Sequence, residues 1–213
     1  MLGSGRASEI YDLGDGRVLR RFKTEGDPER EALVMRHALQ HGYPVPHVLE
    51  VQDDALVLER IDGPTMLERL WRRPWAMPRA AHVLADLHHR LHGIEAPSEL
   101  ASAGPGERLL HLDLHPENVI MSPAGPVVID WTNARRGDPA LDPAMTWVIL
   151  ASSGGRRARL FLRSFLPRFD HDELVHALSL AAARRIADPN VTDGEREAVR
   201  RLLAEQQGSD PKA

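Results

Sequence analysis

The stretch 111-HLDLHPENVI-120 places two histidines, one aspartate, one glutamate and one asparagine within ten residues of a 213-residue chain. One interpretation is a metal site, because strand alternation would put His111, Asp113 and His115 on one face. Pro116 opposes it, since proline interrupts a strand, and no obvious fourth ligand follows. A second interpretation is a polar loop that its leucines and valine anchor to the core.

A third interpretation is a catalytic loop, in which His111, Asp113 and Asn118 precede the apolar strand 126-PVVID-130. The Asp113 carboxylate could accept a proton from, or orient, a hydroxyl that attacks a phosphoryl group. Asn118 offers an amide oxygen and Asp130 a carboxylate oxygen, and Mg²⁺ prefers such oxygen ligands. The order of these residues around an apolar strand favours a magnesium-nucleotide site over the other two interpretations.

The first sixty residues predict a small sheet with one helix rather than a repeated β-α-β unit. Asp15-Gly16 is typical of a two-residue hairpin turn. Asp27 can cap a helix that begins at Pro28, and its apolar stripe is Ala32, Leu33, Met35, Ala38 and Leu39. The expected elements are strands at 9–13 and 17–22, a helix at 29–41, and two strands within 47–63 that join at Asp53-Asp54.

From Pro64 onward the apolar spacing becomes helical, first in 65–75 and 78–94 and again from about Asp142 to Gln207. Breaks in the last region are expected at 153–155, Pro167 and 188–189. His88 and His92 lie four apart on the second segment, where two side chains can share a metal. His89 stands where a metalloprotease helix carries glutamate, so we expect a solvated helix edge instead.

Composition excludes several classes of protein. Apolar residues make up 42% and charged residues 27% of the chain, as in globular proteins, and no apolar run is long enough to cross a membrane. The absence of cysteine excludes a disulfide scaffold and a thiolate zinc site and fits a reducing compartment. A net charge of −4 gives no reason to expect nucleic acid as a partner. With no signal peptide evident at the N-terminus, we expect a cytoplasmic protein; nothing assigns an oligomeric state.

Together, "HLDLHPENVI" and "PVVIDWTNARRGDPALD" resemble the catalytic segment of the aminoglycoside phosphotransferase and choline kinase-like family, which shares the protein-kinase fold. The resemblance covers nearly the whole chain. It implies an α+β fold of two lobes: a small β-rich N-lobe with one main helix at 1–62, and a mostly helical C-lobe at 63–207. Residues 208–213 are expected to be a frayed tail.

The resemblance also implies roles for individual residues. Asp113 matches the catalytic base, Asn118 and Asp130 the magnesium ligands, and His111 and Asp142 residues that support the loop. For the nucleotide, Gly3, Ser4 and Gly5 match the phosphate-covering loop and Glu31 the ion-pair glutamate of the helix. Backbone groups of Glu59, Arg60 and Ile61 match the segment that meets adenine.

The basic residue of the third strand departs from the family pattern, because Arg20 aligns where a lysine is expected. Arg20 shares a strand face with Val18 and Phe22, whereas Lys23 lies on the other face. A guanidinium can hold phosphates with two hydrogen bonds, so we expect Arg20 rather than Lys23 to be the phosphate clamp.

The resemblance implies a kinase that moves the γ-phosphate of ATP, or another nucleoside triphosphate, with Mg²⁺ to a small-molecule hydroxyl. The alternative is a kinase-fold nucleotide-binding or regulatory protein with little turnover. The C-terminal helices are expected to form the acceptor pocket. The basic segment 156–168 is interpreted as a solvated helix face, and its charge disfavours a polycationic aminoglycoside.

Overall fold

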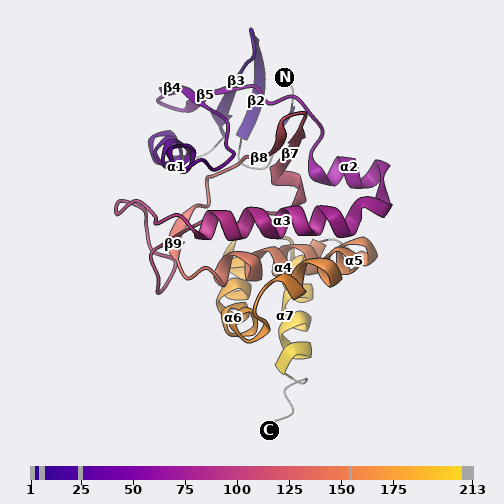
Figure 1. Ribbon diagram of the computed structural model, residues 1–213. Coiled ribbons are helices and arrows are strands. Elements are labelled where there is room, and N and C mark those ends of the chain that lie inside the picture. The colour runs from indigo at the N-terminus through magenta and orange to yellow at the C-terminus, as the bar shows by residue number, and fades with distance from the viewer. Residues whose placement is uncertain (1–2, 5–7, 24–25, 154, 208–213) are drawn as a thin grey trace.

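The N-terminal lobe is an antiparallel five-stranded sheet with one helix beside it (Figure 1). The computed structural model describes residues 3–4, 8–23, 26–153 and 155–207. The strand order is β1-β2-β3-β5-β4, and α1 contacts β4 and β5. The elements are β1 (Gly3–Ser4), β2 (Ser8–Gly14), β3 (Arg17–Phe22), α1 (Pro28–Gln40), β4 (Val48–Gln52) and β5 (Ala55–Glu59).

Local sequence accounts for the hairpin between β2 and β3. Asp15 and Gly16 have φ angles of 51° and 73°, the positive values that a tight two-residue turn requires at both positions. The Asp27 side chain accepts a hydrogen bond from the Arg30 amide at 2.9 Å, and Pro28 opens α1. Both features are as the sequence predicts.

The buried face of α1 differs from the predicted stripe by one residue. Leu33 is 38% exposed, while Val34 is buried against the sheet together with Met35 and Ala38. Leu33 and Val34 are adjacent apolar residues, so the helical period alone allows either one to lie on the buried face. The contacts of α1 with the sheet decide which of them is buried.

The connection from β5 to the second lobe is fastened by a close backbone contact. Gly63 has a φ of 148°, and a Cβ at this position would lie 2.6 Å from the Met121 carbonyl oxygen. The Met121 amide donates to the Pro64 carbonyl at 2.9 Å. Only glycine permits this backbone angle and approach, so the connection is held against β7.

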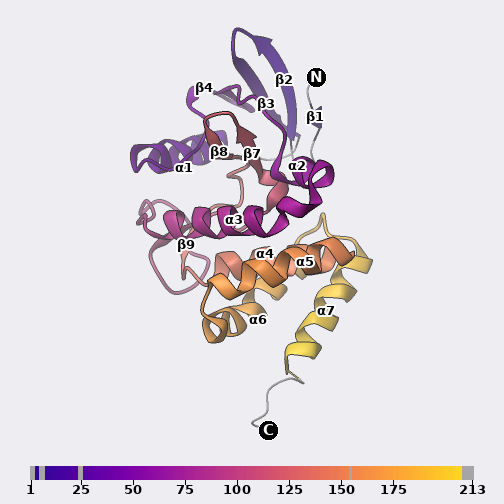
Figure 2. The ribbon, with the colours of Figure 1, turned by 45° about the vertical axis from the view of Figure 1, so that its right-hand side comes forward.

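The second lobe is mostly helical, with α3 crossing the molecule between the sheet and the C-terminal helices (Figures 1 and 2). It also contains two short antiparallel pairs, β6 with β9 and β7 with β8. Apart from three short 3-10 turns, its elements are α2 (Met66–Arg72), α3 (Met77–His92), β6 (Arg108–Leu110), β7 (Val119–Ser122), β8 (Gly125–Val128), β9 (Arg135–Gly137), α4 (Leu141–Ser153), α5 (Gly155–Phe165), α6 (His171–Ala187) and α7 (Asp193–Gln207).

Helix α4 is the centre of this lobe. Its first nine residues, 141–149, are all buried, and α3, α5, α6 and α7 contact it. The predicted breaks coincide with helix ends: α4 ends at Ser153 and α5 begins at Gly155, Pro167 lies in the 3-10 turn between α5 and α6, and 188–189 lies between α6 and α7. The two-lobed α+β fold predicted from the sequence is therefore confirmed.

Two expectations concern residues outside the described part of the chain, namely Gly5 and the tail 208–213. Within the described part, no helix combines the length and the apolar character needed to cross a membrane.

Candidate active site

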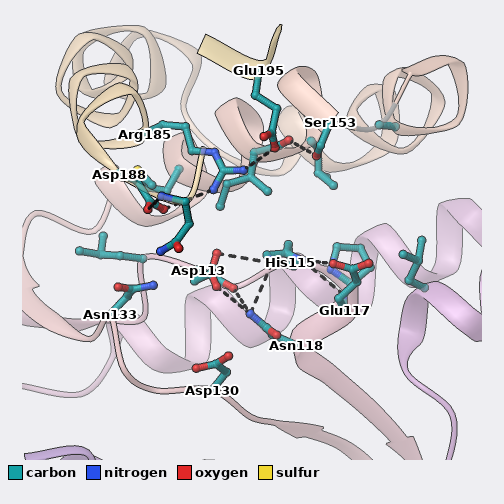
Figure 3. Close-up of a pocket in the computed structure, with 18 of the residues that line it drawn as sticks. Asp113, His115, Glu117, Asn118, Asp130, Asn133, Ser153, Arg185, Asp188 and Glu195 are labelled. Atoms are coloured by element: carbon teal, nitrogen blue, oxygen red, sulfur yellow. Dashed lines mark hydrogen bonds and ion pairs between the residues drawn. The ribbon is translucent and has the colours of Figure 1, made fainter. Parts of the chain in front are cut away.

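A cavity of about 1400 Å³ opens between the 111–118 loop and the C-terminal helices. Asp113, Asn118 and Asp130 all line it, and Figure 3 shows the three side chains close together on one wall. The structure therefore brings together three residues that the sequence predicts to act together, although eleven residues separate Asn118 from Asp130.

A buried carboxylate at the start of α4 shapes the loop. The Asp142 side chain has no exposed surface and accepts hydrogen bonds from the amides of His111 at 3.0 Å and Leu112 at 2.7 Å. Leu112 has a φ of 61°, a left-handed conformation that costs a non-glycine residue free energy. The two bonds to Asp142 stabilise that turn, which immediately precedes Asp113.

The ring of His111 ties the loop to the segment before Asp130. Its Nδ1 accepts from the Asp113 amide at 3.3 Å, so its Nε2 carries the proton that it donates to the Ile129 carbonyl at 3.1 Å. Burial lowers the His111 pKa, which favours the neutral ring. With both nitrogens bonded to backbone, His111 is not arranged as a metal ligand, and the left-handed Leu112 breaks the strand alternation on which that interpretation depends.

Asn118 and His115 hold the Asp113 side chain. The Asn118 Nδ2 group donates to the Asp113 carbonyl at 2.8 Å and to its Oδ2 atom at 3.0 Å. His115 Nε2 lies 3.4 Å from Asp113 Oδ1. The Asp113 carboxylate is thus oriented by neighbours while 23% of its side chain remains exposed to the cavity.

Arg20 joins the N-terminal sheet to this site. Only 4% exposed, it donates to Ser8 Oγ at 3.1 Å, to the Glu31 carboxylate, to Asp130 Oδ1 at 2.5 Å and to Thr132 Oγ1 at 3.0 Å. Lys23 lies exposed just beyond β3. The structure therefore brings Arg20, and not Lys23, to Asp130.

The charges in this cluster shift one another's titration. Desolvation alone would raise the pKa of Asp130, but the charge and hydrogen bond of Arg20 outweigh it and hold the pKa below its usual range. For Glu31, burial outweighs the charge of Arg20 and raises the pKa. Strand β8 ends at Val128, two residues earlier than the predicted strand. Asp130 therefore lies outside the strand, where it adopts a φ of 66° and its side chain is 37% exposed.

The expectation that His88 and His92 form a solvated helix edge is wrong. His88 is fully buried, with Nδ1 3.7 Å from Asp142 Oδ2, and His92 Nε2 lies 3.3 Å from the same oxygen. Ligand atoms of the three residues lie within 4.8 Å of one another, a spacing that a metal could bridge. Since Asp142 already accepts two backbone amides and His88 Nε2 contacts Thr146 Oγ1 at 3.2 Å, the group is better described as a hydrogen-bonded support.

Among the residues that the structure describes, none of those predicted to bind the nucleotide, Arg20 included, lines the cavity. Gly3 and Ser4 form β1, which pairs with Ile10 and Glu9 at the edge of the sheet. At the end of β5, the Glu59 amide donates to the His47 carbonyl at 2.9 Å and the Arg60 amide to Gly16 at 2.8 Å. Ile61 follows them, half-buried, at the start of the connection between the lobes.

Five arginines line the cavity, a feature that the sequence did not predict. They come from β9, α5 and α6: Arg135, Arg156, Arg157, Arg184 and Arg185. The start of segment 156–168 was expected to be a solvated helix face. Arg156 and Arg157 are exposed, as expected, but they also line the cavity, and the Arg157 guanidinium lies 4.0 Å from the Trp71 ring centroid. The only signal in the sequence was the density of arginines itself.

Comparison with known proteins agrees with this architecture. One solved structure, a thermostable mutant of aminoglycoside phosphotransferase APH(4)-Ia, superposes with a TM-score of 0.70 at 17% identity, covering 99% of this chain and 94% of its own. A choline/ethanolamine kinase family protein from Mesorhizobium loti gives 0.63 at 18% identity, with 96% and 85% covered. The GDP and kanamycin complex of APH(2")-IIia gives 0.65 at 15% identity, with 98% and 92% covered. No curated protein sequence matches the chain.

The fold and the convergent loop residues define a two-lobed, kinase-like class of protein. The family model described as "Phosphotransferase enzyme family" matches residues 67–185, more than half of the chain. The chain belongs to that phosphotransferase family.

Proposed function

We propose that this protein is a small-molecule kinase that transfers the γ-phosphate of Mg-ATP, or of another nucleoside triphosphate, to a hydroxyl group. The observation that carries the proposal is the convergence of Asp113, Asn118 and Asp130 on one cavity, with Arg20 reaching Asp130 from the other lobe. Solved relatives of the fold are complexed with AMP-PNP and hygromycin B, or with GDP and kanamycin, which supports a nucleotide and a hydroxyl-bearing acceptor.

The residues present fit a magnesium ion. Asp130 supplies a carboxylate beside the cavity, and Asn118, whose nitrogen is bonded to Asp113, keeps its amide oxygen as a second hard ligand. When bound, the ion would neutralise negative charge on the transferring phosphoryl group. In this proposal Arg20, held by Glu31, is the phosphate clamp, and it turns from Asp130 towards the nucleotide.

The Asp113 carboxylate serves the acceptor. It accepts the hydroxyl proton as the acceptor oxygen bonds to the γ-phosphorus, while the bond to the leaving nucleoside diphosphate breaks. The bonds from Asn118 and His115 fix its orientation, which lowers the entropic cost of aligning the two reactants. The Glu59 and Arg60 amides already donate hydrogen bonds within the N-terminal lobe. In this proposal the Ile61 backbone and the carbonyl oxygens of residues 59–61 therefore contact adenine.

Nucleotide binding and turnover test the proposal separately. We expect ATP to raise the melting temperature only with Mg²⁺, by roughly 5–10 °C at a hundredfold excess over Kd. Asp113→Asn should keep this shift but lower phosphoryl transfer about 10²–10⁴-fold, because a general base is lost. Asp86→Asn, an exposed aspartate of α3, is the matched control. Stabilisation without turnover on any acceptor would favour the alternative, a nucleotide-binding protein; no stabilisation would contradict the nucleotide site.

A further inference from the structure

Beyond the predicted site, two chemically different sets of side chains line the cavity. One set is apolar and comes from α2, α4 and α5, and it includes Leu70, Ile149 and Phe161. The other set consists of arginines from β9, α5 and α6. A ligand in the cavity could contact the apolar set with its body and the arginines with its polar groups.

The acidic residues of the cavity do not neutralise all of these arginines. Arg185 takes both nearby carboxylates: its guanidinium lies 3.0 Å from Glu195 and 3.9 Å from Asp188. Figure 3 shows these three side chains together, across the cavity from Asp113. In the part of the chain that the structure describes, no carboxylate lies within 4.0 Å of Arg135 or Arg184.

Of these two arginines, Arg135 has the better-defined surroundings. It lies half-buried in β9, five residues after Asp130, and its own hydrogen bond goes to the Ala134 carbonyl at 2.8 Å. Burial lowers its pKa, and the neighbouring charges of Arg30 and Arg184 lower it further. A guanidinium remains charged at neutral pH, so Arg135 meets the like charge of Arg184, which lines the same cavity, and that of Arg30, which does not.

An anion bound at this point would relieve that repulsion and form charge-assisted, two-point hydrogen bonds. A cationic ligand would add to the repulsion. We propose that the acceptor is an anionic hydroxyl compound, a hydroxy acid or a phosphorylated polyol, whose acid group binds Arg135 and Arg184 while its hydroxyl meets Asp113. The inference rests on the proposed function, because it names the substrate class of the same site.

The reaction would join the acceptor oxygen to the γ-phosphorus of the nucleotide and break the bond to the β-phosphate oxygen. The hydroxyl proton goes to Asp113, and the nucleoside diphosphate leaves with the bonding pair. The products are the phosphorylated acid and the nucleoside diphosphate, so no oxidant or further reactant is needed.

Matched acceptors test the charge preference. Release of ADP from Mg-ATP is followed with glycerol, glycerate and 3-aminopropane-1,2-diol, and with glucose, gluconate, glucose 6-phosphate and glucosamine. We expect the anionic members to have kcat/KM values at least about tenfold above their neutral partners, with the amines lowest. Gluconate against glucose 6-phosphate then distinguishes a carboxylate from a phosphate. Binding of the same compounds to the Mg-AMP-PNP complex is measured by calorimetry.

Arginine variants test the location. Arg135→Gln and Arg184→Gln should each raise KM, or the calorimetric Kd, for the preferred anion about ten- to hundredfold, as expected for one lost charge-assisted contact. Arg163→Gln, an exposed arginine of α5 outside the cavity, should change neither value. A preference for neutral or cationic acceptors, no binding of any anion, or variants that leave its affinity unchanged would overturn the inference. Failure of Mg-AMP-PNP binding itself would instead contradict the proposed function.

Discussion

Asp130 and Asp142 both lie near the 111–118 loop, but they differ in exposure and in hydrogen-bond partners. Asp142 has no exposed surface and accepts two backbone amides and, at 3.3 Å, His92. Asp130 is 37% exposed, lines the cavity and contacts side chains, those of Arg20 and Thr132, rather than backbone amides. The comparison suggests that one carboxylate shapes the backbone and the other is kept available for a ligand.

The pKa values of the two residues support this division. Burial opposes ionisation in both, yet both have a pKa below the usual range. In Asp130 the charge of Arg20 outweighs desolvation. In Asp142 the compensation comes from His88 and His92, and the two backbone amides add further hydrogen bonds to the charged form. A partner such as Arg20 can be exchanged for a cation, whereas the backbone amides that Asp142 accepts cannot leave without unfolding the turn.

Exchanging each carboxylate for an amide gives the sharpest test, with the largest expected effects. Asp130→Asn should lower phosphoryl transfer about 10³-fold or more, since charge stabilisation worth several kcal/mol is lost, with a stability change of about 1 kcal/mol or less. Asp142→Asn should lower the free energy of unfolding by about 3 kcal/mol, because an amide leaves one buried backbone donor unpaired. Urea unfolding and ADP release measure the two effects. Equal losses of stability in both variants would contradict the division between a structural Asp142 and a ligand-binding Asp130.

The sequence predicted the first of these residues better than the second. Asp130 ends an apolar segment that follows Asp113 and Asn118 in the sequence. That order predicted a shared site of oxygen ligands before any fold was considered. Asp142 was expected to support the loop only by resemblance. Its partners are backbone amides thirty and thirty-one residues away and histidines on another helix, and no local pattern encodes such contacts.

The same limit explains the errors. The period of α3 placed His88 on a helix, but its burial depends on α4 and Phe165, which pack against it. Arg156 and Arg157 are exposed, as their composition predicted, but the sequence could not show that α5 places them beside the cavity. Local signals such as Asp15-Gly16 and the three helix breaks were predicted correctly because backbone preferences of nearby residues decide them.

A second test asks whether the exchangeable partner is Arg20. Arg20→Gln should weaken Mg-nucleotide binding about tenfold to a hundredfold, roughly 2 kcal/mol, because its side chain reaches Asp130 and would face the phosphates. Lys23→Gln, exposed at the end of β3, should change affinity less than threefold. Calorimetric titration measures both, and circular dichroism checks that Glu31, deprived of its cation, has not unfolded α1. A larger loss in Lys23→Gln would reverse the assignment of the clamp.

The smallest expected effect concerns the support around Asp142. Burial lowers the His88 and His111 pKa values below 6.5, so the unfolded chain binds more protons than the folded one just below that pH. The free energy of unfolding should therefore be highest above about pH 6.5. It should fall as the pH decreases towards 5, by at most about 1.4 kcal/mol per pH unit for each histidine.

His88→Gln should reduce this pH slope by the contribution of up to one proton. His82→Gln, at an exposed histidine of the same helix, controls for the loss of a histidine from α3. Urea unfolding at half-unit intervals from pH 5 to 7.5 measures the slope. If His88→Gln kept the wild-type slope, the ring would not be held neutral beside Asp142. The carboxylate would then rely on a charged imidazole, as Asp130 relies on Arg20, and the contrast between the two carboxylates would be one of exposure alone.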